Sequence, residues 1–162
     1  MPYLVDANCF IQAKNSFYGF DFCPGFWDWI DQQHALKTLF SIDKIALELA
    51  KGNDDLAAWA KQKGGDFFLP MDTATGQKNR IITTWVQQAG FRQHVIDEFF
   101  RGADPFLIAY AFAHNYTVVT HEIKVNANQM NKVKIPNVCA EFNIQHVTIF
   151  DLLRSTGAKL HI

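Results

Sequence analysis

The sequence lacks long apolar runs and is poor in cysteine. No apolar run approaches the ~20 residues of a membrane-spanning helix, so we expect no contact with a membrane. The three cysteines (Cys9, Cys23 and Cys139) are odd in number and have no Cys-x-x-Cys spacing, which favours reduced thiols. The opening residues MPYLVDANCF have no basic segment and reach Asp6 after a short apolar run. We therefore expect no signal peptide and a cytoplasmic location.

Several catalytic signatures are also absent from the sequence. It contains neither the GxGxxG pattern of dinucleotide-binding folds nor the GxxxxGK[ST] pattern of the P-loop. It has no Gly-x-Ser-x-Gly segment, which argues against a serine hydrolase of that type. The six histidines form no HxxxH pair, so a zinc enzyme is also disfavoured.

The charge is balanced, because 15 Lys and Arg residues face 16 Asp and Glu residues, for a formal net charge of −1. This balance provides no general field for a polyanion, so any contact with nucleic acid must come from a local patch. Apolar residues make up 49% of the 162 residues and aromatic residues 14%. We expect a single domain over residues 1–162 with a substantial hydrophobic core.

Short buried strands alternate with helical patterns along the chain. The runs Tyr3–Val5, Tyr116–Thr120 and His146–Ile149 are typical of strands buried on both faces. Helical patterns are expected from residue 8 onward and over 26–39, 41–50, 54–63, 75–88, 91–100, 105–113, 135–142 and 150–155. Loops are expected over 15–25 and 123–134. The alternation predicts an α/β fold with a mostly parallel central sheet.

The stretch Ala103–Glu122 combines a helix start, a buried helix and a buried strand. The Asp104-Pro105 pair predicts a helix start, with the carboxylate at the N-cap and the proline at the first helical position. The strand that follows delivers Glu122 to the carboxyl edge of the sheet, where open α/β sheets bind ligands. Helix capping alone could explain Asp104, and Glu122 could be a solvated side chain.

Two further acids have positions like these. Asp6 ends the first strand, which should be central in the sheet, although Asp6 could also serve as a helix cap. Glu48 lies at the border of the apolar stripe of the helix predicted over 41–50, where it could be a rim residue. In contrast, we interpret Asp97 and Glu98 as surface charge.

The topology lets Asp6, Glu48, Asp104 and Glu122 converge. Gathered carboxylates repel one another unless a cation lies among them. Oxygen ligands without a His or Cys partner suit Mg²⁺ or Mn²⁺. Such an ion can polarise a phosphodiester and lower the pKa of a water molecule for in-line attack.

The segments YLVDAN, IALEL, ADPFLIAYA and VVTHE together resemble a PIN domain. PIN domains are metal-dependent ribonucleases that include the VapC-type toxins. The resemblance implies a three-layer α/β/α PIN-like fold, with Asp6, Glu48 and Asp104 as ligands of Mg²⁺ or Mn²⁺. It places Asn8 and Thr120 beside them as supporting polar residues. The tail IPNVCAEFNIQHVTIFDLL resembles an uncharacterised branch of PIN-like proteins.

The sequence departs from the PIN pattern just after the strand expected over Tyr116–Thr120. Glu122 stands where PIN proteins usually carry Asp, and Lys124 stands where many have a further acid. We therefore expect one well-bound ion, with a second one recruited only by substrate or absent. Lys124, Lys132 and Lys134 are candidates for contacts with RNA.

The resemblance implies an endoribonuclease that cleaves RNA and is the toxin of a toxin–antitoxin pair. Its expected partner is an antitoxin protein, and the protein could also form a homodimer. A catalytically inactive PIN-like module that binds RNA or protein is the main alternative. A haloacid-dehalogenase-like phosphatase is less favoured, because its second Asp is replaced here by Asn8.

Overall fold

The computed structural model describes residues 1–126 and 131–161, and the described chain is built on one five-stranded sheet. The strand order is β3-β2-β1-β4-β5, and every neighbouring pair is parallel. The strands are β1 (Tyr3–Val5), β2 (Leu39–Ile42), β3 (Phe68–Leu69), β4 (Thr117–Val119) and β5 (His146–Val147). The parallel sheet and the central position of β1 confirm the predictions made from the alternating pattern.

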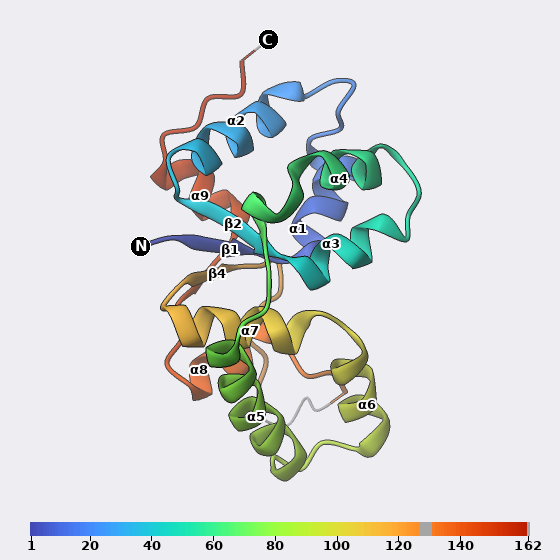
Figure 1. Cartoon of the computed structure of the whole chain (residues 1–162), viewed down its shortest axis with the longest axis vertical. Coiled ribbons are helices and arrows are strands. Elements are labelled where there is room, and N and C mark those ends of the chain that lie inside the picture. The colour runs from blue at the N-terminus through green and yellow to red at the C-terminus, as the bar shows by residue number, and fades with distance from the viewer. Residues whose placement is uncertain (127–130, 162) are drawn as a thin grey trace.

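Helices cover both faces of the sheet, which gives the expected three layers (Figure 1). One layer contains α1 (Ala7–Gln12) with its π-helical continuation η1 (Ala13–Phe17), α2 (Pro24–Ala35), α3 (Asp43–Ala50), α4 (Asp55–Phe67) and α9 (Ile149–Ser155). The other contains α5 (Thr73–Gln88), α6 (Gln93–Arg101), α7 (Asp104–His114) and α8 (Ile135–Glu141). Within the described chain, no helix combines the length and apolar character needed to cross a membrane.

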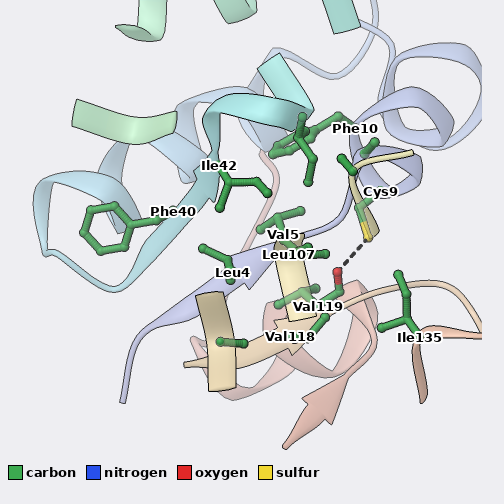
Figure 2. Packing of buried hydrophobic residues seen from close by; sticks show 14 of the residues in the cluster. Leu4, Val5, Cys9, Phe10, Phe40, Ile42, Leu107, Val118, Val119 and Ile135 are labelled. Carbon is green, nitrogen blue, oxygen red and sulfur yellow. Dashed lines mark hydrogen bonds between the residues drawn. The ribbon is translucent and has the colours of Figure 1, made fainter. Parts of the chain in front are cut away.

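The core lies between the sheet and these two layers (Figure 2). Leu4 and Val118 on neighbouring strands are fully buried, and Leu107 of α7 packs in the same cluster. The thiol of Cys9, in α1, donates to the backbone oxygen of Val119 at 3.5 Å. Since both faces of the sheet are covered, the strands can be short, continuous apolar runs.

The prediction of one helix over 41–50 was wrong at its beginning. Ser41 and Ile42 belong to strand β2, and the helix begins at Asp43. All residues of β2 are buried, so the strand shows no alternation of apolar and polar positions. Ser41 is accommodated because its hydroxyl donates to the backbone oxygen of Val5 at 2.7 Å.

Other boundaries also differ from the predictions. The loop expected over 15–25 contains the end of η1 and the beginning of α2, which starts at Pro24. The short apolar piece around Phe68 is the edge strand β3. Residues 127–130 of the loop expected over 123–134 lie outside the described residues.

Replacing Leu107 by Ala tests how much the α7 face contributes to the core. Leu107 is 0% exposed, whereas Leu47 on α3 is 62% exposed. The same truncation should therefore lower the free energy of unfolding by about 3–5 kcal/mol at Leu107 and by less than about 0.5 kcal/mol at Leu47. Urea denaturation followed by circular dichroism measures both values. Equal losses at the two positions would contradict the packing described here.

Candidate active site

The carboxyl ends of β1 and β4 lie side by side where the strand order reverses. From β1 the chain adds β2 and β3 on one side and then β4 and β5 on the other. In parallel α/β sheets this switch point forms the crevice where ligands bind. Val5 is paired with Val119, so the next residues, Asp6 and Thr120, emerge next to each other (Figure 2 shows the two valines).

Asp6 is buried at this crevice with an exposed fraction of 1%. Its backbone N–H donates to the oxygen of Val119 at 2.9 Å, and the Thr120 hydroxyl donates to its Oδ2 at 3.1 Å. Asp6 occupies the N-cap position of α1, but its side chain makes no capping hydrogen bond. Capping therefore does not explain this carboxylate.

Asp104 is the first residue of α7, and the N-cap position belongs to Ala103. The prediction that the Asp104 carboxylate caps the helix was wrong, because α7 has no side-chain capping bond. The side chain instead lines a cavity of about 210 Å³ together with Glu48 and Lys132. A carboxylate in the first turn is still favoured by the helix dipole.

Glu48 connects α3 to the beginning of α7. Its Oε1 accepts the backbone N–H of Ala103 at 2.8 Å. This bond satisfies a backbone donor at the helix start and holds Glu48 beside Asp104, whose pKa it raises. Glu48 is thus half-buried and fixed at the cavity wall.

Glu98 of α6 is an acid whose place the sequence interpretation missed. It is exposed, as expected for surface charge, but it also lines the cavity that contains Glu48 and Asp104. The amphipathic pattern of α6 gives no signal for this position. Only the packing of α6 beside α7 brings the carboxylate to the cavity.

Glu122 differs from the other acids because both of its carboxylate oxygens have partners. Oε1 pairs with the Lys132 ammonium at 2.7 Å, and Oε2 accepts the backbone N–H of Ile135 at 2.7 Å. The Glu122 side chain is 8% exposed, and its own N–H donates to the Thr120 hydroxyl at 3.1 Å. Glu122 therefore anchors the beginning of α8 to the end of β4.

The negative charges of these acids raise the pKa values of their neighbours. Burial, followed by the charges of Asp104 and Glu122, raises the pKa of Asp6 to about 8. Burial and the charge of Glu122 raise the pKa of Asp104 to about 6, with Lys132 opposing the shift and Glu48 adding to it. The carboxylates of Asp6, Glu48 and Glu122 therefore all lie within electrostatic reach of Asp104.

The remaining predicted residues surround this cluster. Thr120 is buried against Asp6, whereas Asn8 is exposed on α1 and lines a cavity of about 400 Å³ with Glu122 and Lys134. Lys124 lines an adjacent cavity of about 370 Å³. Lys132 and Lys134 each line a cavity with Glu122, and both also line the cavity of Lys124.

The donor set fits a hard divalent cation, although the carboxylates are not drawn together around one point. Within residues 1–126 and 131–161, no three His, Cys, Asp or Glu side chains lie close enough to hold a metal ion. Asp6 is nevertheless buried and Asp104 half-buried, both have a raised pKa, and neither side chain caps a helix. Oxygen donors of this kind suit Mg²⁺ or Mn²⁺.

Comparison with known proteins places the chain in a family and supports the fold. A family described as "Domain of unknown function (DUF4411)" matches residues 3–160. No curated protein matches the chain. This chain is similar to a chain in the crystal structure of VapBC2 from Rickettsia felis bound to a promoter DNA fragment. The TM-score is 0.51 and the sequence identity is 15%, and the match covers 91% of this chain and 98% of that chain. Identity this low shows the fold alone, and that fold is PIN-like.

Replacing Asp6 by Asn should stabilise the metal-free protein at alkaline pH. Because its pKa is raised from 3.8 to about 8, the folded protein holds a proton that the unfolded chain releases. The free energy of unfolding therefore falls as pH rises from about 4 to 8. Asp6→Asn should remove much of this decline and add about 1–3 kcal/mol at pH 8.

Denaturation in EDTA at pH 5 and pH 8 measures this effect. Asp28→Asn is the matched control, because Asp28 is an exposed carboxylate of α2. Its pH dependence should follow that of the unmodified protein. A loss of stability at pH 8 in Asp6→Asn would contradict the unfavourable burial of this charge.

Proposed function

Since the chain belongs to the DUF4411 family and has a PIN-like fold, we propose that it is a Mg²⁺- or Mn²⁺-dependent endoribonuclease that hydrolyses RNA phosphodiesters. One observation carries the proposal: the buried Asp6 and the half-buried Asp104 lie within electrostatic reach of each other, and their carboxylates cap no helix. Two such charges are unfavourable without a nearby cation. Their position at the switch point of the sheet is where a ligand of an α/β fold binds.

In this proposal Asp6 and Asp104 hold the ion, and Glu48 lies beside Asp104 at the cavity wall. When bound, the ion supplies positive charge that polarises the phosphodiester and lowers the pKa of a water molecule. Thr120 orients the Asp6 carboxylate through its hydroxyl. Glu48 fixes the beginning of α7, and therefore the position of Asp104.

Glu122 has a positioning role in this scheme. Its carboxylate already binds Lys132 and the N–H of Ile135, so it keeps the Lys132 ammonium beside Asp104. An ammonium at this place can contact a phosphate of the RNA backbone. The engagement of Glu122 supports one tightly held ion, with a second recruited only by substrate or absent.

We further propose that the protein is the toxin of a toxin–antitoxin pair and that it acts in the cytoplasm. The likeness to a chain of VapBC2 supports this role. The partner would then be an antitoxin protein that covers the acidic crevice. A homodimer is the alternative assembly.

The second candidate function is a PIN-like module that binds RNA or protein without cleavage. Two features favour this binding module: both carboxylate oxygens of Glu122 already have partners, and Lys124 stands in place of an acid. A haloacid-dehalogenase-like phosphatase is less well supported, because Asn8 stands where its second carboxylate is needed and cannot serve as the general acid.

Asp6→Asn and Asp104→Asn should each lower kcat/KM for cleavage of an end-labelled RNA by about a hundredfold or more, because each removes a charged ligand of the ion. Gel assays with Mn²⁺ and with EDTA measure this loss. Asp28→Asn should cleave like the unmodified protein. Unchanged cleavage in both site variants would refute the assignment, and absence of cleavage in the unmodified protein would favour the binding module.

The toxin role has a separate test in cells. Expression of the unmodified chain should arrest growth, and co-expression of the neighbouring gene should relieve the arrest. Asp104→Asn should be tolerated, because the proposed toxicity depends on cleavage. Growth without arrest at equal protein levels would count against a toxin, but not against nuclease chemistry.

A further inference from the structure

A cavity of about 370 Å³ lies next to the acidic site, and the ribonuclease function does not account for it. Trp85 of α5 and Phe91, which precedes α6, line one part of it. Lys124, Lys132 and Lys134 line another. We propose that this cavity, here called the Trp85 pocket, binds one nucleotide of a single-stranded RNA substrate, an inference that rests on the proposed function.

Trp85 provides a fixed aromatic surface. Its ring makes edge contacts with Phe91 and Phe142, with centroids 6.5 and 5.9 Å apart. Trp85 is only half-buried, whereas Trp27, Trp29 and Trp59 are 4%, 5% and 9% exposed. A held indole that remains accessible is the kind of surface on which a nucleobase stacks, whatever its identity.

The lysines of the pocket provide the charge for the phosphates. Lys132 is paired with Glu122, but Lys124 and Lys134 have no ion-pair partner within the described chain. Among the described residues that line the pocket, Glu141 alone carries a carboxylate. In a protein with a formal net charge of −1, this is the local basic patch that RNA binding requires.

The wall that carries Lys124 is held in place without a ligand. Asn137 of α8 accepts the N–H of Val125 at 3.0 Å and donates to its oxygen at 2.9 Å. This reciprocal pair fastens the segment after β4 to α8. The lysines therefore start from an ordered wall, which lowers the entropy cost of binding.

The location connects the pocket to the acids. Lys132 lines the Trp85 pocket and also the cavity that contains Glu48 and Asp104. An RNA strand with one phosphate at the acids can thus place a neighbouring nucleotide against Trp85. The volume is within the usual range for a small-ligand site, and the combination of cations with an aromatic ring fits single-stranded nucleic acid better than a protein helix.

The test measures binding of a labelled, unstructured eight-nucleotide RNA by fluorescence anisotropy. All proteins carry Asp104→Asn, so that the RNA is not cut. Lys124→Gln combined with Lys134→Gln should weaken binding about tenfold and lower the slope of log Kd against log salt by about 1.4, because two phosphate contacts are lost. Lys51→Gln with Lys61→Gln removes two exposed lysines of the α3–α4 side and should change neither value.

The base contact is tested with RNAs that carry a single abasic nucleotide at each position in turn. One position should cost the protein with Trp85 about tenfold in affinity, and it should cost Trp85→Leu almost nothing. Trp85 fluorescence should also be quenched by the intact RNA. Because Trp85 contacts Phe142, thermal denaturation checks that Trp85→Leu is folded; the lysine variant and the abasic series remain decisive if it is not.

Unchanged RNA affinity in the lysine variant, together with an abasic series without a sensitive position, would overturn the proposal. The pocket would then be open to a protein partner instead of RNA. If cleavage depends on Asp6 while these pocket results are negative, the nuclease stands and the pocket assignment fails. If the pocket binds RNA but the unmodified protein never cleaves it, the proposed function fails and the pocket assignment stands.

Discussion

The repulsion between the buried carboxylate of Asp6, after β1, and the half-buried carboxylate of Asp104, at the beginning of α7, is the constraint on which this site depends. The register of β1 and β4 places Asp6 beside Thr120, and the first turn of α7 brings Asp104 within electrostatic reach. Burial makes each charge expensive, and proximity makes the pair more so. A fold that keeps such groups together gives up stability at this point, which is the usual cost of a functional site.

The fold offsets part of this repulsion with one of its own cations. Lys132 pairs with Glu122 and opposes the shift in the pKa of Asp104. Burial disfavours its charge, but the bond to Glu122 and the charges of the nearby acids raise the pKa of Lys132 overall. The ammonium stays protonated and borders both the acidic cavity and the Trp85 pocket, so one side chain connects the proposed chemistry to the proposed binding of RNA.

The sequence predicted the features that arise from local patterns. A strand ending in Asp6 and the Asp104-Pro105 helix start can be recognised within a few residues, and the parallel sheet follows from their alternation with helices. Strand β2 was missed because Ser41 interrupts its apolar run and Ile42 fits the helical spacing of Ile45 and Leu49. The buried Ser41 obtains its partner from β1. Glu98 and the Lys132–Glu122 pair were missed because packing between distant segments creates them.

The central claim is that Asp6 and Asp104 share one divalent cation. Anomalous diffraction from crystals grown with Mn²⁺ tests it most directly, because the peak locates the ion relative to both carboxylates. We predict one strong peak between Asp6 and Asp104, within about 2.0–2.3 Å of an oxygen of each, and its loss in Asp6→Asn. A well-diffracting crystal at millimolar Mn²⁺ with no peak there, or with the ion bound elsewhere, would contradict the account.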